Sequence, residues 1–176
     1  MEKANALLRT NEAENEYDFT LELIYNRQVD TVFRVCFLFM KNVPDAEDCV
    51  QDTFLKLIKK QKIFENHEHE KAWLIVTASN ICKNKLRNWW NRGVNLESIQ
   101  NLTELSQANS SQDDIENDYV LNEVLSLPEK YKLPVYLYYF SGYKTDEISR
   151  MLKKNPNTVR TLLRRARKIL EEKLLL

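Results

Sequence analysis

Residues that end or bend regular structure are scarce in this chain. Its 176 residues include only two glycines, Gly93 and Gly142, and four prolines, too few for a sheet of many short strands. Apolar residues instead recur every three to four positions, the period of an α-helix. No window approaches eighteen consecutive apolar residues, and the charged first residues lack the apolar run of a signal peptide. The sequence therefore predicts an all-α, cytoplasmic protein without membrane insertion.

Charge divides the chain into three parts. The formal net charge is zero, but Lys71–Arg92 holds five bases and no acid, and Lys144–Lys173 holds ten bases against four acids. Between these blocks, Glu97–Asp118 carries six acids and no base in a run rich in Ser, Asn and Gln, which is typical of a flexible linker. We therefore expect two small helical domains, residues 1–93 and 119–176, joined by a flexible acidic linker, residues 94–118.

The end of the chain, from Thr145 onward, has the pattern of a helix-turn-helix. Thr145 is positioned to cap a short first helix. Asn155 followed by Pro156 favours the start of a second helix, because Asn caps free amides and proline loses no hydrogen bond there. Opposite its apolar face the second helix carries an arginine stripe: Arg160, Arg164, Arg165 and Arg167. The pattern predicts a second helix that enters the major groove of DNA.

Asn42 and Pro44 predict that one helix ends and another begins in the first domain. Acidic and polar residues share the outer side of this new helix: Asp45, Glu47, Asp48, Gln51 and Asp52. Acids early in a helix complement its dipole, which explains the first three acids more naturally than Asp52. The alternative is an acidic docking face for a basic partner. The pattern alone leaves both explanations open.

A third helix, expected from about Glu70 to Trp90, has an unusual polar face. This face mixes amides, cations and an aromatic ring without any acid: Trp73, Thr77, Asn80, Lys83, Asn84, Arg87, Asn88 and Asn91, followed by Trp89 and Trp90. Amides read base edges, cations hold phosphates, and indole rings stack on unpaired bases. The face is therefore a candidate surface for nucleic acid. Ordinary solvation of the polar residues, with burial of one tryptophan, is the alternative.

Residues that could carry metal or redox chemistry are few and badly spaced. Cys36, Cys49 and Cys82 are an odd, widely separated set in apolar surroundings, which favours buried free thiols over disulfides. His67 and His69 have no partners at familiar ligand spacing, and two glycines are too few for a phosphate-binding loop. We expect no catalytic residue, no metal and no cofactor, so an enzyme is the least supported class.

Three segments, in this order and spacing, resemble the extracytoplasmic-function (ECF) group of bacterial sigma factors, which keep the second and fourth conserved regions. The segments are DAEDCVQDTF (45–54), KAWLIVTASNICKNKLR (71–87) and LPEKYKLPVYLYYFSGYKTDEISRMLKKNPNTVRTLLRRARKIL (127–170). The resemblance implies a subunit that binds core RNA polymerase, recognises two promoter elements in duplex and single-stranded DNA, and helps to open the duplex. It also implies a possible anti-sigma factor as an inhibitory partner.

The resemblance assigns a role to each of three residue sets. The set that docks on the clamp helices of the largest polymerase subunit is Asp45, Glu47, Asp48, Gln51, Asp52 and Phe54. The set that reads the minus-ten element is Trp73, Thr77, Asn80, Lys83, Asn84, Arg87, Asn88 and Trp89. The set that reads the minus-thirty-five element is Asn155, Asn157, Thr158, Arg160, Thr161, Arg164, Arg165 and Arg167. The loop QKIFENHEHE would help to form a pocket for an extruded base, and the flap of the second-largest subunit is a further expected contact.

Some positions depart from the family pattern. Lys153 and Lys154 stand where the family has glycine and an apolar residue, so the turn between the last two helices is expected to differ slightly. Asn84 replaces a common aspartate and Ser79 a common basic residue, which prevents transfer of a minus-ten preference. Pro134 predicts a kink or a late helix start.

The alternative function is a stand-alone helix-turn-helix regulator, whose first domain senses a ligand or dimerises and needs neither the acidic stripe nor the basic aromatic helix.

Overall fold

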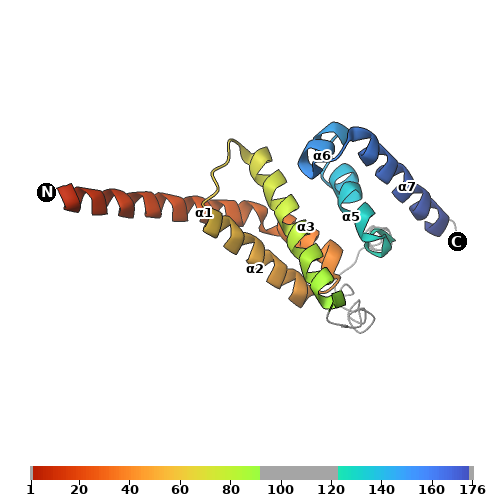
Figure 1. Ribbon diagram of the computed structural model, residues 1–176, viewed down its shortest axis with the longest axis horizontal. Helices are drawn as coiled ribbons and strands as arrows, with labels where there is room; N and C mark the ends of the chain where they lie inside the picture. Colours follow the sequence, from red (N-terminus) through yellow and green to blue (C-terminus); the bar gives the residue numbers. More distant parts are fainter. Residues whose placement is uncertain (1, 92–122, 175–176) are drawn as a thin grey trace, which may run out of the picture.

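A computed structural model describes residues 2–91 and 123–174, with side chains described for 20–91 and 123–173. Over these ranges the chain is all-helical, as predicted. The named elements are α1 (Glu2–Met40), α2 (Val43–Lys60), α3 (His67–Asn91), α5 (Glu129–Val135), the π-helical turn η3 (Tyr136–Phe140), α6 (Thr145–Leu152) and α7 (Pro156–Leu174) (Figure 1). The expected linker, 94–118, lies outside the described residues.

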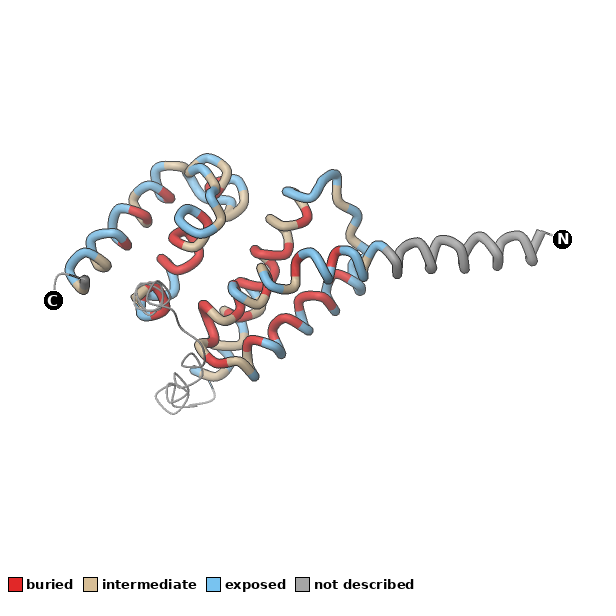
Figure 2. The backbone as a smooth tube through the Cα atoms, turned by 180° about the vertical axis from the view of Figure 1, so that it is seen from behind, coloured by how far each residue is buried: buried red, intermediate tan, exposed pale blue. Residues whose placement is uncertain are grey.

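Helices α1, α2 and α3 form a bundle around a shared core. Helix α2 begins where expected, because the Asn42 side chain accepts a hydrogen bond from the Asp45 amide (2.9 Å) and Pro44 lies in the first turn. It ends at Lys60, and the capping residue Gln61 has a left-handed conformation (φ 43°). The buried positions of the three helices face inward (Figure 2), with Val32, Leu57 and Leu74 among the most fully buried side chains.

In the second domain, α5 and α7 lie side by side and α6 packs across their end (Figure 1). Pro134 lies inside α5, and the helix widens into the π-helical turn two residues later, so the expected disturbance takes this form. Gly142 follows that turn with φ +72°, a conformation that disfavours residues with a side chain.

The helix-turn-helix forms with two local details. Asn155 accepts a hydrogen bond from the Asn157 amide (2.9 Å) and Pro156 opens α7, which confirms the predicted helix start. The predicted cap at Thr145 is wrong by one residue. Lys144 is the N-cap, and its amide donates to the Glu147 carboxylate (2.7 Å). Lys153 adopts the left-handed conformation (φ 50°), so the tight turn persists without a glycine.

Candidate polymerase and promoter interfaces

The outer side of α2, which faces away from the bundle core, holds most of the residues expected to bind the polymerase. Four of them are exposed: Glu47, Asp48, Gln51 and Asp52. Phe54, expected in the same set, is only 8% exposed, and its ring centre lies 4.8 Å from that of Tyr25. Phe54 therefore belongs to the core, because its spacing matches that of the other buried positions of α2.

Two apolar side chains on the same side of α2 were missed by the sequence reasoning. Leu55 is 49% exposed and Ile58 is 46% exposed. Leu55 follows Asp52 by three residues and Asp48 by seven, a spacing that places all three on one helix face. From this spacing alone, the sequence could have placed Leu55 beside the two acids. We call these six residues the docking face: Glu47, Asp48, Gln51, Asp52, Leu55 and Ile58.

Asp45, also expected to bind the polymerase, is already held by two partners within the bundle. One carboxylate oxygen accepts from the Asn42 side chain (2.9 Å), and the other lies 3.2 Å from the Lys85 ammonium of α3. The same ammonium lies 3.1 Å from the Asp48 carboxylate. Burial alone would lower the pKa of Lys85, but the hydrogen bonds to Asp48 and Asp45 outweigh burial and raise that pKa. Lys85 is thus a firmly charged bridge from α3 to α2.

On α3, most of the residues expected to read the minus-ten element lie together on one side of the helix, and one of them is buried. Asn80, Lys83, Asn84, Arg87 and Asn88, which we call the base-reading face, are exposed or half-buried. Thr77 is only 6% exposed, so the expectation that it contacts DNA directly is not supported. Thr77 lies at the edge of the polar face of α3, where it packs against the rest of the bundle.

The two aromatic candidates on α3 are half-buried. The Trp73 ring centre lies 5.8 Å from that of Phe64 in the preceding loop, which fixes the start of α3 against that loop. Trp89 lies 5.3 Å from the Lys85 ammonium, in a cation–π geometry, whereas Trp90 is 73% exposed. One of the final tryptophans is therefore available to stack on a base and the other is partly engaged.

Helix α7 exposes almost all of its expected minus-thirty-five residues. Asn155, Asn157, Thr158, Arg160, Arg164, Arg165 and Arg167 are exposed, and Thr161 is half-buried. Three of the arginines differ in how far they are engaged. Arg160 donates to the Asn157 side chain (2.9 Å) and lies 3.5 Å from the Asp146 carboxylate, and Arg167 pairs with Glu171. Arg164 makes no ion pair within the described side chains, so it is the freest of the three.

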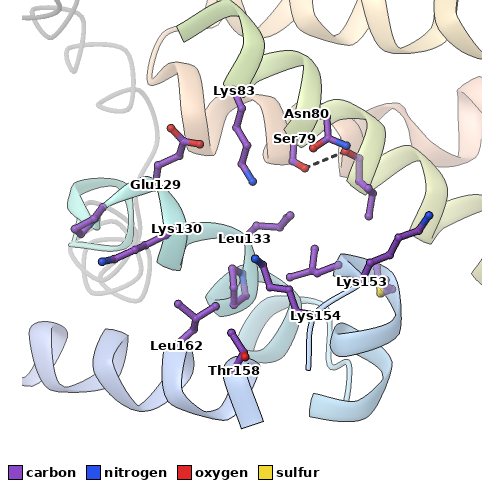
Figure 3. Close-up of a pocket in the computed structure, with 15 residues that line it drawn as sticks. Ser79, Asn80, Lys83, Glu129, Lys130, Leu133, Lys153, Lys154, Thr158 and Leu162 are labelled. Atoms are coloured by element: carbon purple, nitrogen blue, oxygen red, sulfur yellow. Dashed lines mark hydrogen bonds between the residues drawn. The ribbon is translucent and has the colours of Figure 1, made fainter. Parts of the chain in front are cut away.

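A cavity of about 1070 Å³ lies between the two domains (Figure 3). Asn80 and Lys83 of α3 line one side, and Lys154 and Thr158 of the helix-turn-helix line the other. Burial lowers the pKa of Lys83, Glu129 opposes that shift, and the Lys154 charge adds to it. Residues expected to read two separate promoter elements thus border the same space.

Beside this cavity the domains are in direct contact. Lys132 of α5 is only 5% exposed, and its ammonium donates to the backbone carbonyl of Leu38 in α1 (2.8 Å). Burial, and then the nearby Lys41 charge, lowers the pKa of Lys132 to about 8. A second contact joins the Tyr143 hydroxyl, as donor, to the Glu68 carboxylate (3.1 Å). The central contact therefore buries a lysine that has no carboxylate partner among the described side chains.

Comparison with known proteins decides the family. Residues 24–92 match the model of sigma-70 region 2, and residues 117–170 match the model of sigma-70 region 4. The RNA polymerase sigma factor SigV of Bacillus subtilis is 31% identical over 143 residues, which cover 78% of this chain and 81% of SigV. The chain is an ECF sigma factor of the sigma-70 family. It directs RNA polymerase to promoters, and its partners are core polymerase and promoter DNA.

Two further relatives agree with this assignment. The ECF RNA polymerase sigma factor SigW of Bacillus subtilis is 24% identical over 156 residues, covering 82% of this sigma factor and 83% of SigW. The solved structure of the sigma factor RpoE of Bartonella quintana, in complex with the anti-sigma factor NepR, has a TM-score of 0.67. It is 23% identical and covers 90% of this chain and 98% of its own, so it supports the fold.

A second cavity of this sigma factor, of about 780 Å³, lies between α1 and the loop that precedes α3. Loop residues Ile63 and Phe64 line it together with Arg27 of α1 and with His67 and Glu70 in the first turn of α3. Arg27 donates two hydrogen bonds to the Glu70 carboxylate (3.0 and 2.8 Å), and Gln28 donates a third to it (2.9 Å). The hydrogen bond to Glu70 also raises the pKa of Arg27. This network fixes the inner wall of the cavity.

The thiols of the sigma factor are placed as predicted, because Cys36, Cys49 and Cys82 are free and fully buried. A hydrogen bond to Cys82, and then burial, raises the pKa of Cys49. A hydrogen bond to Cys36 raises the pKa of Cys82; the bond to Cys49 opposes this shift and burial adds to it. Within the described residues, no group of three His, Cys, Asp or Glu side chains is arranged to hold a metal ion. Within the same part of the chain, no helix combines the length and apolar character needed to cross a membrane.

Proposed function

We propose that this sigma factor contributes recognition and strand separation, while the polymerase supplies the chemistry. In this proposal the docking face binds core polymerase, the base-reading face of α3 reads and opens the minus-ten element, and α7 reads the minus-thirty-five element. One observation carries the proposal. A single bundle places an acidic, partly apolar face on α2 and an acid-free face of amides and cations on α3. A stand-alone helix-turn-helix regulator has no use for this pair of surfaces.

In vitro transcription with core polymerase on genomic fragments tests the proposal most directly. The expected result is a set of mapped start sites that appear only when this protein is added. If the protein instead only reduces transcription by a holoenzyme that already contains another sigma factor, the stand-alone regulator becomes the better function.

We expect the double variant Asn80→Ala and Lys83→Ala to impair promoter opening more than duplex binding. Both side chains line the cavity beside α3, and base contacts of this kind contribute about 1 to 3 kcal/mol each. Permanganate footprinting of the melted region should therefore show at least about a tenfold loss of open complex. Lys56→Ala, on the exposed side of α2, removes a charge elsewhere and serves as the control. Equal footprints for all variants would remove this role from α3.

The cavity beside the loop before α3 is a suitable place for an extruded base. Phe64 offers an aromatic ring for stacking, and Arg27 and Glu70 offer polar groups on the inner wall. The cavity volume of about 780 Å³ is ample for one nucleobase. We infer that the non-template strand places one base in this cavity during opening.

For the minus-thirty-five element, Arg164→Ala is expected to weaken duplex binding by about 1 to 3 kcal/mol if the guanidinium reads a base. If it holds a phosphate, the loss is more uniform across sequences and the salt dependence becomes shallower by about one unit of slope. Fluorescence anisotropy on matched and mismatched duplexes separates the two results. Lys168→Ala, one turn further along α7, is the charge-matched control. A variant that changes neither affinity nor salt slope excludes Arg164 from the interface.

The cavity between the domains also bears on inhibition. A protein that filled it would cover Asn80, Lys83 and Thr158 together, and so would block both reading functions with one contact. We infer that an anti-sigma factor of this chain, if the cell makes one, would bind there.

A further inference from the structure

We propose that Lys85 is a positioning residue that lowers the affinity of this sigma factor for core polymerase, by holding Asp45 and Asp48 beside the docking face. The proposal rests on the docking function proposed above. Lys85 belongs to α3, and its ammonium reaches α2 to lie 3.2 Å from Asp45 and 3.1 Å from Asp48. One cation therefore engages two carboxylates at the end of the face where a basic partner would bind.

Contacts from both α2 and α3 fix the position of the Lys85 ammonium. Its side chain is 23% exposed and its ammonium lies over the Trp89 ring at 5.3 Å. The second Asp45 oxygen accepts a hydrogen bond from the Asn42 side chain, so Asp45 cannot turn away from Lys85 without also losing that hydrogen bond. The bridge is therefore part of the folded bundle and is present before any partner arrives.

The two carboxylates bound by Lys85 differ in how far they remain exposed to a partner. The Asp45 side chain is 26% exposed, whereas the Asp48 side chain is 67% exposed. Asp52, one turn further along α2, makes no ion pair within the described side chains. A basic partner thus meets a full negative charge at Asp52 but a shared one at Asp48. To use Asp48 fully, the partner must compete with Lys85.

Electrostatic complementarity acts mainly on the rate of association and on its salt dependence. Removal of the Lys85 charge leaves two uncompensated carboxylates and makes the docking face more negative. The expected effect is an increase in affinity of about three- to tenfold, because partly exposed ion pairs contribute little more than this. The increase should shrink as salt is added, since screening acts on exposed charges.

The test compares full-length Lys85→Met, Lys85→Arg and wild type for binding to immobilised core polymerase over a series of salt concentrations. Methionine keeps an apolar stem beside Trp89 and removes the charge, and arginine retains the bridge. We expect tighter binding and a steeper salt slope for Lys85→Met, and wild-type behaviour for Lys85→Arg. Lys168→Met, at an exposed position of α7 and so away from the docking face, controls for net charge. Lys85→Gln replaces Lys85→Met if circular dichroism shows that the methionine variant is unfolded.

Unchanged or weaker binding by a folded Lys85→Met variant would overturn the proposal, as would an equal gain in Lys168→Met. Asp52→Lys, measured in parallel, separates this failure from failure of the docking function. If Asp52→Lys weakens binding while Lys85→Met has no effect, only the role of Lys85 is wrong. If both variants bind like wild type, the docking face itself is wrong.

Discussion

The double variant Asp48→Lys and Asp52→Lys is expected to lose capture of core RNA polymerase while keeping its fold. Both carboxylates are exposed on the outer side of α2. Asp48→Lys removes one ion pair of Lys85, but that ammonium keeps Asp45 as a partner, so the bundle is expected to stay folded. Like charges placed opposite each other across an interface cost several kcal/mol. Two reversals against a basic partner should therefore lower the affinity by more than about a thousandfold. Co-purification with tagged core polymerase, followed by titration, measures the loss.

The matched control for this prediction is the double variant Glu171→Lys and Glu172→Lys in α7. It makes the same change in net charge in the other domain, where Glu171 pairs with Arg167 and Glu172 with Lys168. Circular dichroism confirms that both double variants remain helical. Undiminished capture by the α2 variant would remove the docking face from the polymerase interface.

The second large effect concerns the contact between the domains, which is expected to strengthen as pH rises from about 8 to 10. The groups that bury the Lys132 ammonium, Leu38 and Phe39, belong to α1 of the other domain. Burial, and then the Lys41 charge, lowers the pKa of Lys132 from 10.5 to about 8, which corresponds to roughly 3 kcal/mol against the charged form. Below pH 8 Lys132 is protonated in both arrangements, so the contact is then weakest and independent of pH.

Between these pH values the separated domains bind more protons than the closed ones, so rising pH favours closure. Lys41 and Lys83 contribute in the same direction, because burial lowers the pKa of each. Glu129 opposes the shift at both Lys83 and Lys132. At higher pH the Tyr143 hydroxyl limits the trend. Burial raises its pKa, but once separated it would ionise in its usual range near 10 and favour opening.

The variant Lys132→Met tests this linkage. We expect it to hold the domains together at neutral pH and to lose most of the pH dependence, since the buried stem remains and the charge is gone. The measurement is the distance between spin labels placed on α2 and α7, followed across pH. Global melting is unsuitable, because the raised pKa values of Cys49 and Cys82 act on unfolding of the bundle itself. A variant whose label distance follows pH like wild type would refute the role of Lys132.

Local chemistry explains which features the sequence could predict. Asn42 with Pro44, and Asn155 with Pro156, specify helix starts through atoms within three residues, and the structure places both starts there. Helical spacing likewise identified the inner and outer sides of α2. The cap at Thr145 was misplaced by one residue because the capping carboxylate came from Glu147, within α6.

The remaining features depend on neighbours that are distant in the sequence. Lys85 lies 37 residues from Asp48, and Lys132 lies 94 residues from Leu38, so no local pattern predicts either partner. The burial of Thr77 has the same origin. A small polar residue at the edge of a helix face is exposed or buried according to what packs beside it, and its spacing is the same in both cases.

While the two domains are in contact, the proposed polymerase and DNA surfaces differ in how accessible they are. The docking face of α2 lies on the outside of the bundle, whereas Asn80 and Lys83 border the space that the C-terminal domain occupies (Figure 3). If polymerase docks on α2 as proposed, it can approach while the domains are still together, whereas a DNA strand that contacts Lys83 has to enter the space between them. We therefore expect free DNA to compete poorly for Lys83 in the unattached factor, and promoter recognition to follow the encounter with polymerase.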